Sequence, residues 1–156
     1  MAIQINIGDH TSPSAGFLPV LSRHRNMFRW ARTKARWIAR NTASANVYYR
    51  GLPGGRSLTA LLADSTIWIN YHATDPDWGI TNFAGGKEIA ICNRAIRMGR
   101  WSVLGTLVHE LAHVNGDAGG GKGAERAVLA CGLGKQSELT SGVDDPATPY
   151  DPTIDG

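Results

Sequence analysis

The sequence contains few cysteines and no long apolar run, and each absence excludes a class of protein. Only Cys92 and Cys131 occur among the 156 residues, so the chain is not a disulfide-rich scaffold. Each cysteine lies within an apolar stretch, so we expect two buried thiols, with a single bridge as the alternative. No run of about 18 apolar residues is present, which argues against a transmembrane helix.

The N-terminal residues also lack a targeting pattern. MAIQINIGDH does not have the basic and then apolar regions of a signal peptide, so we expect no export by the usual secretory route. Hydrophobic residues make up 42% of the chain and charged residues 19%, which is typical of one globular domain. A chain of this length can bury a core without disulfides.

Charge of one sign is missing from two long segments. Residues 21–50 contain eight Arg or Lys and no acid, whereas residues 136–156 contain five acids and no base. The basic segment has the apolar spacing of an amphipathic helix, so we interpret it as a solvated outer helix. Contact with DNA or with an anionic membrane is the alternative function for this surface.

Composition divides the chain into three segments. Residues 1–16 are rich in Gly, Ser, Pro and Thr, and we expect a loose N-terminal segment there. Residues 141–156 contain three Pro and four Asp, which predicts an acidic, Pro-rich C-terminal tail. One folded domain is therefore expected at residues 17–140, and we see no internal repeat.

Hydrophobic periodicity predicts an α+β fold with a small, mostly antiparallel sheet. Helical spacing predicts helices, and alternation predicts strands. The expected helices are residues 22–41, 57–64, 103–114 and 123–131, and the expected strands are residues 47–49, 66–71 and 87–92.

One of these helices contains a metal-binding pattern. In residues 103–114, VLGTLVHELAHV, the leucines and valines occupy one arc of about 140°, so that face is expected to be buried. His109 and His113 are four residues apart and lie on the same side of the helix, where both imidazoles can bind one ion. The sequence His109-Glu110-Leu-Ala-His113 is H-E-x-x-H, in which Glu110 can reach a water at the open position of a zinc ion.

On this motif, residues 66–132 resemble the zinc metallopeptidases called zincins. The resemblance implies a compact zincin-like domain that hydrolyses peptide bonds with a Glu-activated, zinc-bound water. It also implies Zn²⁺ as cofactor, His109 and His113 as metal ligands, and Glu110 as the general base that shuttles a proton to the leaving amine.

The third ligand distinguishes the zincin subfamilies. The metzincin pattern would place a histidine where this chain has Gly119, so that subfamily is not expected. Helical projection places Glu125 on the apolar side of residues 123–131, where a carboxylate needs a partner. We therefore expect Glu125 to be the third ligand, in the gluzincin arrangement, although the usual N-E-x-x-S-D motif is absent. Asp117, His72 and an ion pair between Glu125 and an arginine of the first helix remain alternatives.

Zincins also need a group that stabilises the oxyanion and a strand that binds the substrate. The sequence does not identify the oxyanion group, and the candidates are Tyr71, His72 and Tyr150. Because zincins typically bind a peptide along an edge strand, we expect residues 87–92 to be that edge strand.

The small size resembles the compact metallopeptidase toxin and effector domains of polymorphic toxin and contractile secretion systems. This resemblance implies a peptide or protein substrate, a secretion carrier or an immunity protein as partner, and delivery by a contractile or other signal-independent route. We expect a monomer and no nucleic-acid partner. The alternative function is a nucleic-acid-binding protein that uses the basic helix and contains a structural zinc site.

Overall fold

The computed structural model describes residues 2–134 and has an α+β fold, as predicted. The expected C-terminal tail, including Tyr150, lies outside the described residues. The elements are β1 (Gln4–Ile5), the 3-10 helix η1 (Ser22–His24), α1 (Arg25–Asn41), α2 (Ala43–Arg50), α3 (Leu58–Leu62), β2 (Trp68–His72), β3 (Gly79–Thr81), β4 (Glu88–Cys92), α4 (Asn93–Met98), α5 (Arg100–Val114) and α6 (Gly123–Ala130).

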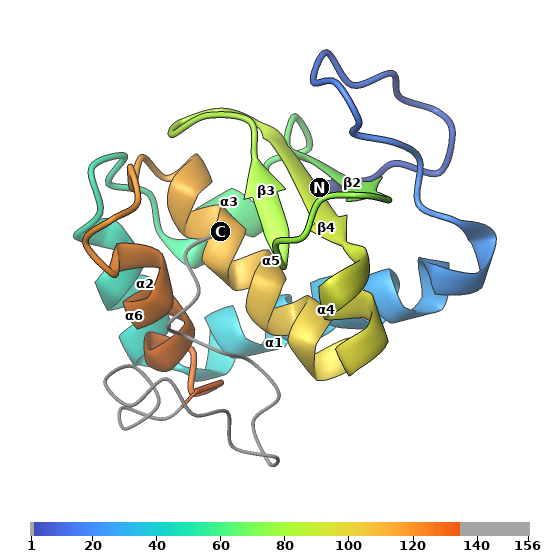
Figure 1. Cartoon of the computed structure of the whole chain (residues 1–156). Helices are drawn as coiled ribbons and strands as arrows, with labels where there is room; N and C mark the ends of the chain where they lie inside the picture. The colour runs from blue at the N-terminus through green and yellow to red at the C-terminus, as the bar shows by residue number, and fades with distance from the viewer. Residues whose placement is uncertain (1, 135–156) are drawn as a thin grey trace.

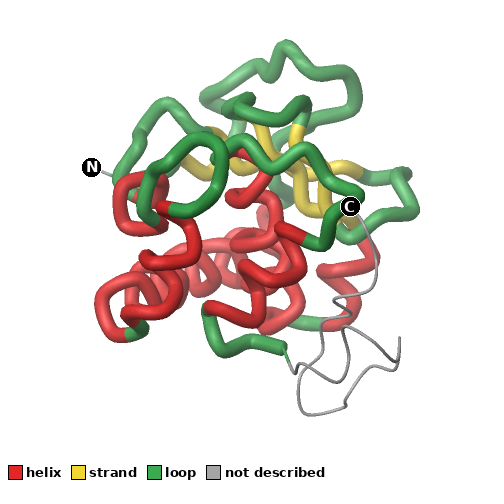
Figure 2. The backbone as a smooth tube through the Cα atoms, turned by 90° about the vertical axis from the view of Figure 1, so that its left-hand side faces the viewer, coloured by secondary structure: helices red, strands yellow, loops and turns green. Residues whose placement is uncertain are grey.

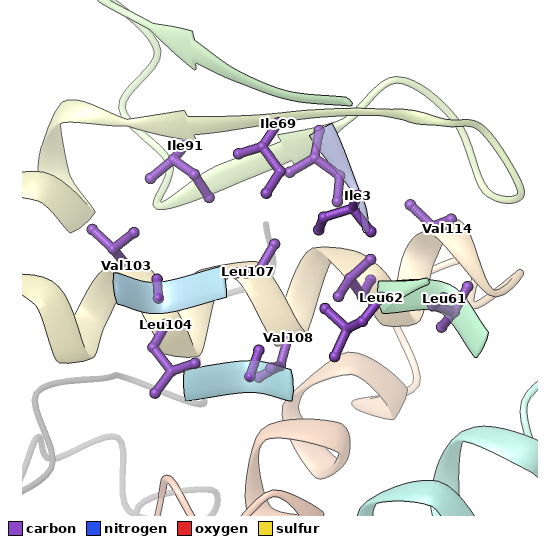
Figure 3. Packing of buried hydrophobic residues seen from close by; sticks show 14 of the residues in the cluster. Ile3, Leu61, Leu62, Ile69, Ile91, Val103, Leu104, Leu107, Val108 and Val114 are labelled. Carbon is purple, nitrogen blue, oxygen red and sulfur yellow. The ribbon is translucent and has the colours of Figure 1, made fainter. Parts of the chain in front are cut away.

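The strands form one layer above the helices (Figures 1 and 2). Helix α5 lies between the sheet and the other helices, in contact with α1, α4, α6, β3 and β4. Figure 3 shows Ile69 and Ile91 of the sheet facing Val103 and Leu107 of α5. Because α5 has neighbours on several sides, 12 of its 15 residues are buried. The burial therefore extends well beyond the single leucine and valine arc that we expected.

The sheet is mixed, and not mostly antiparallel as we expected. Its strand order is β1-β2-β4-β3. The β1–β2 and β2–β4 pairs are parallel, and only the β3–β4 pair is antiparallel. Residues 87–92 were expected to form the edge strand, but β4 pairs on both sides and is internal. The edge next to β4 is β3, which was not predicted because it is only three residues long.

The N-terminal segment is not loose over its first residues, which corrects our expectation for residues 1–16. Ile3 and Ile5 are buried in the core, and β1 adds a strand beside β2. The rest of the segment lies against the outer face of the sheet: His10 stacks on Trp68 with ring centroids 4.1 Å apart. Ile3, Ile5 and Ile7 alternate with other residues as in a strand, but the pattern is too short to predict a strand within a polar segment.

Residues 47–49 were predicted to be a strand but belong to α2. Tyr49 is fully buried on this helix, and its hydroxyl donates a hydrogen bond to the carbonyl of Val108 on α5. Packing of α2 against α1, α3 and α6, together with this bond to α5, therefore overrides the strand propensity of Val47 and the two tyrosines. Cys92 and Cys131 are free and buried, which confirms the prediction of two thiols.

Candidate metal centre

Helix α5 places the two motif histidines one turn apart beneath β3. The ring centroids of His109 and His113 are 5.1 Å apart. Strand β3 lies against α5 (Figure 1), and Gly79 is where the two elements approach most tightly. A Cβ atom at Gly79 would lie 2.5 Å from Cγ2 of Thr106 and 3.1 Å from Cγ of Glu110. Gly79 thus allows the edge strand to cover the motif.

His113 is held by a hydrogen bond at one ring nitrogen, which leaves the other nitrogen unpaired in the described part of the chain. Its Nδ1 lies 2.7 Å from the backbone carbonyl oxygen of Asp117. Because a carbonyl oxygen only accepts, Nδ1 must carry the proton, which leaves the lone pair on Nε2. That Nε2 atom is buried and has no hydrogen-bond partner within residues 2–134. A buried nitrogen in this state is suited to bind a metal ion.

Asp117 does not present its carboxylate to that nitrogen. Its Oδ2 atom lies 3.5 Å from Nδ1 of His113, on the opposite side of the ring from Nε2. The same oxygen accepts a hydrogen bond from the backbone N–H of Gly119. Asp117 therefore orients the His113 ring by bonding to Nδ1, and leaves Nε2 to other partners.

Helix α6 brings Glu125 to the other histidine. Oε1 of Glu125 lies 3.0 Å from Nε2 of His109, and both residues are only 2% exposed. The helical projection therefore predicted correctly that Glu125 points inward. The pair joins α6 to α5, two helices that lie in contact (Figure 1).

The carboxylate of Glu110 lies between the histidines and the edge strand. Oε2 accepts a hydrogen bond of 3.1 Å from the hydroxyl of Thr81 on β3. Oε1 is 3.7 Å from Nδ1 of His109, and it is buried with no hydrogen-bond partner in the described part of the chain. Ligand atoms of His109, Glu110 and His113 lie within 4.8 Å of one another, so this group can hold a metal ion.

The carboxylates also determine the charge of His109. Burial lowers its pKa, but hydrogen bonds and charge interactions with Glu110 and Glu125 outweigh burial and raise the pKa to about 9. In the absence of a metal, the two carboxylates therefore favour the protonated form of His109. A metal ion that binds here displaces that proton, because a ligating imidazole must be neutral.

A pocket of about 220 Å³ opens beside His113. Ile80 and Thr81 of the edge strand line one side, and Asp117 and Ala118 line another. The pocket connects the histidine-bearing turn with the edge of the sheet. A small molecule or a short peptide segment can therefore approach this turn from outside.

Two of the candidates for stabilising an oxyanion lie elsewhere. His72 packs edge-on against Phe17, with ring centroids 6.2 Å apart, on the face of the sheet that the N-terminal segment covers. The hydroxyl of Tyr71 hydrogen-bonds to Oδ1 of Asn93 at 2.8 Å. The third candidate, Tyr150, is outside the described residues.

Sequence reasoning missed two residues that border the centre. Thr81 could not be found because β3 was not predicted. Tyr48 donates a hydrogen bond of 2.7 Å to the carbonyl of Gly123, at the start of α6. Burial and the carboxylates of Asp117 and Glu125 raise the pKa of Tyr48.

Comparisons with protein-family models, with curated proteins and with solved structures found no match. Among the described helices, none is both long enough and apolar enough to cross a bilayer.

Proposed function

We propose that the chain is a zinc-dependent metallopeptidase. The main support is one arrangement: Nε2 of His109 faces Oε1 of Glu125 at 3.0 Å, while Nε2 of His113 is buried without a hydrogen-bond partner in residues 2–134. Two histidines and one glutamate are a donor set that zinc takes in catalytic sites. His109, His113 and Glu125 are thus the proposed ligands.

The donor atoms suit zinc in type, and the separation of His109 and Glu125 suits it in distance. The ligand atoms that all lie within 4.8 Å of one another are those of His109, Glu110 and His113, so Glu125 must move closer to His113 to complete the proposed set. Two ligands of a tetrahedral zinc ion are about 3.3 Å apart, close to the separation of His109 and Glu125. Nitrogen and carboxylate oxygen are both zinc ligands, and the hydrogen bond from His113 to the Asp117 carbonyl is typical of a ligating histidine. The pocket beside His113 favours a catalytic ion over a closed structural one.

Glu110 is the proposed general base. When bound, Zn²⁺ supplies Lewis acidity that polarises the scissile carbonyl and acidifies water. The Glu110 carboxylate accepts a proton from the attacking water and returns it to the nitrogen of the leaving amine. The hydroxyl of Thr81 holds Oε2 of Glu110, so Oε1 is the oxygen available for this transfer.

The substrate is proposed to be an extended peptide. Strand β3 is at the end of the strand order, and its residues Ile80 and Thr81 line the pocket beside His113. A peptide that adds to this edge as another strand would pass over the histidines, with its backbone bonded to β3. The substrate-binding strand that we propose is therefore β3, and not residues 87–92.

We further propose, from the resemblance alone, that the domain acts as a delivered toxin or effector. Its partners would then be a secretion carrier and an immunity protein. The alternative function, nucleic-acid binding with a structural zinc, does not account for the pocket beside His113, or for the Glu110 carboxylate, which is buried next to His109 with Oε1 unpaired in the described part of the chain.

Cleavage of a peptide library tests the proposed function. The zinc-loaded protein is incubated with peptides from a digested proteome, and new termini are identified by mass spectrometry. We expect cleavage by the wild type, and none by Glu110→Gln with its zinc retained. Thr33→Val, at an exposed site on α1, serves as a control that retains activity. Equal cleavage by the wild type and Glu110→Gln, or no cleavage by either, would overturn the proposal.

A further inference from the structure

The solvent side of α1 has a positive charge that no acid of residues 2–134 balances. Residues 10–63 contain no Asp or Glu. Arg29, Arg36 and Arg40 are exposed on this helix, and no carboxylate within residues 2–134 forms an ion pair with them. The arginines are therefore available to an external anionic partner.

Exposed tryptophans lie among these cations. Trp37 is 47% exposed and Trp101, near the start of α5, is 43% exposed. The Lys34 ammonium lies 3.9 Å from the centre of the Trp37 ring and 5.9 Å from that of Trp101. Trp30 joins the two helices, since its ring centroid is 5.0 Å from that of Trp101. Aromatic and basic side chains thus form one patch across α1 and α5.

Two further basic residues of α1 lie at a hollow between α1 and α3. Arg36 and Arg40, one helical turn apart, line a pocket of about 120 Å³ together with Thr59 and Leu62. Two guanidinium groups at a small pocket suit a phosphate group, to which arginine can donate two parallel hydrogen bonds. We call Trp30, Lys34, Arg36, Trp37, Arg40 and Trp101 the basic–aromatic surface.

We propose that the basic–aromatic surface docks on a membrane that contains anionic lipids. Lysine and arginine are attracted to the negative surface potential of such membranes, and tryptophan is favoured at the membrane–water interface. The hollow at Arg36 and Arg40 receives a lipid phosphate. This inference goes beyond the proposed function and does not depend on zinc or on peptide cleavage.

A lipid partner accounts for the patch better than a nucleic acid does. A base that stacks on tryptophan needs an exposed ring face. Lys34 lies over the ring of Trp37, and the Arg100 guanidinium lies over that of Trp30 at 4.5 Å. Cations therefore already lie over these rings, whereas the ring edges and the neighbouring Met98, which is 45% exposed, can enter the interface.

Vesicle co-sedimentation of the full chain tests this proposal. We compare vesicles of phosphatidylcholine alone with vesicles that also contain about 30% phosphatidylserine. The wild type should sediment with the anionic vesicles only, and more weakly at high salt. Arg36→Glu/Arg40→Glu should lower the partition coefficient at least about tenfold, whereas the charge-matched control Arg23→Glu/Arg50→Glu should lower it much less. Trp37→Ala should weaken binding that remains at high salt.

Circular dichroism and thermal unfolding establish that each variant is folded. Trp37→Phe, which keeps an aromatic ring, replaces Trp37→Ala if the alanine variant does not fold. Equal losses in the two double variants would mean that net charge alone drives binding, and would overturn the proposal. Binding of a short oligonucleotide without vesicle binding would assign the surface to nucleic acid. A third outcome is that the wild type binds no vesicles and binds only after the acids of residues 136–156 are neutralised. That result would make the acidic segment, and not a membrane, the partner of the basic–aromatic surface.

Discussion

Nε2 of His109 lies 3.0 Å from Oε1 of Glu125, across the contact between α5 and α6. Both side chains are almost completely buried, so neither water nor a surface counter-ion can replace this pairing. The relationship joins the H-E-x-x-H turn to a carboxylate 16 residues further along the chain. It makes Glu125, and not Asp117, the proposed third ligand.

Substitution of these two carboxylates should have very different effects on zinc affinity. Glu125→Gln replaces a charged ligand by a neutral amide, so we expect the affinity to fall by more than about 100-fold. Asp117→Asn should change it by less than about tenfold, because the His113 ring is held by the backbone carbonyl of Asp117. Competitive titration of both variants with a zinc chelator measures this. A larger loss of zinc affinity in Asp117→Asn than in Glu125→Gln would make Asp117 the third ligand and would contradict the role proposed for Glu125.

Thr81 should affect turnover without affecting zinc. Its hydroxyl donates to Oε2 of Glu110, so Thr81→Val removes the bond that orients the proposed base. We expect zinc content to remain at the wild-type level and kcat to fall about tenfold, with a smaller change in KM. Thr81→Ser, which retains the hydroxyl, should recover most of the rate. No difference between the Val and Ser variants would remove Thr81 from the mechanism.

Some of this arrangement could be predicted from the sequence because it depends on local periodicity. The spacing of His109 and His113 and the inward direction of Glu125 both follow from helical geometry. By contrast, β3 is three residues long and is defined by its pairing with β4. Thr81 was missed because its role depends on that long-range contact.

The same reason explains the errors at Tyr49 and at the N-terminus. Tyr49 is buried on a helix and its hydroxyl bonds to the Val108 carbonyl of α5, and Ile3 and Ile5 are in the core because β1 pairs with a strand more than 60 residues away. Neither contact leaves a local signature strong enough to outweigh composition.

Asp64 should stabilise the fold in a pH-dependent way. Although burial alone would raise its pKa, hydrogen bonds from Thr66, Lys87 and Arg56 dominate and lower it well below the usual value. A lowered pKa contributes stability above the unfolded-state pKa of about 3.9, and this contribution is lost as the pH falls through the folded-state pKa. Asp64→Asn should therefore cost about 1–2 kcal/mol at neutral pH, since Lys87 and Arg56 are partly exposed.

Denaturant unfolding of the wild type and Asp64→Asn over a series of pH values measures the difference. We expect the gap in unfolding free energy to be constant from neutral pH down to about pH 5 and to shrink in stronger acid. A gap that grows as the pH falls would contradict this account.

The two thiols should be inert in the folded protein. Burial, the first cause, raises the pKa of Cys92 to about 12, with further contributions from Asp75, Glu110 and Asp77, and burial raises that of Cys131 to about 12. At about pH 8 neither thiolate is populated, so we expect no reaction with Ellman's reagent until denaturant is added. Two thiols should then react; rapid reaction of either one before unfolding would contradict its burial.

The most direct test of the proposed centre is anomalous X-ray diffraction from crystals of the zinc-loaded protein, recorded on both sides of the zinc absorption edge. The account predicts one zinc ion, bound by Nε2 of His109, Nε2 of His113 and a carboxylate oxygen of Glu125, with the carboxylate of Glu110 beside the remaining position. A zinc ion bound elsewhere, an ion that lacks Glu125 as a ligand, or no anomalous peak at these histidines would contradict it.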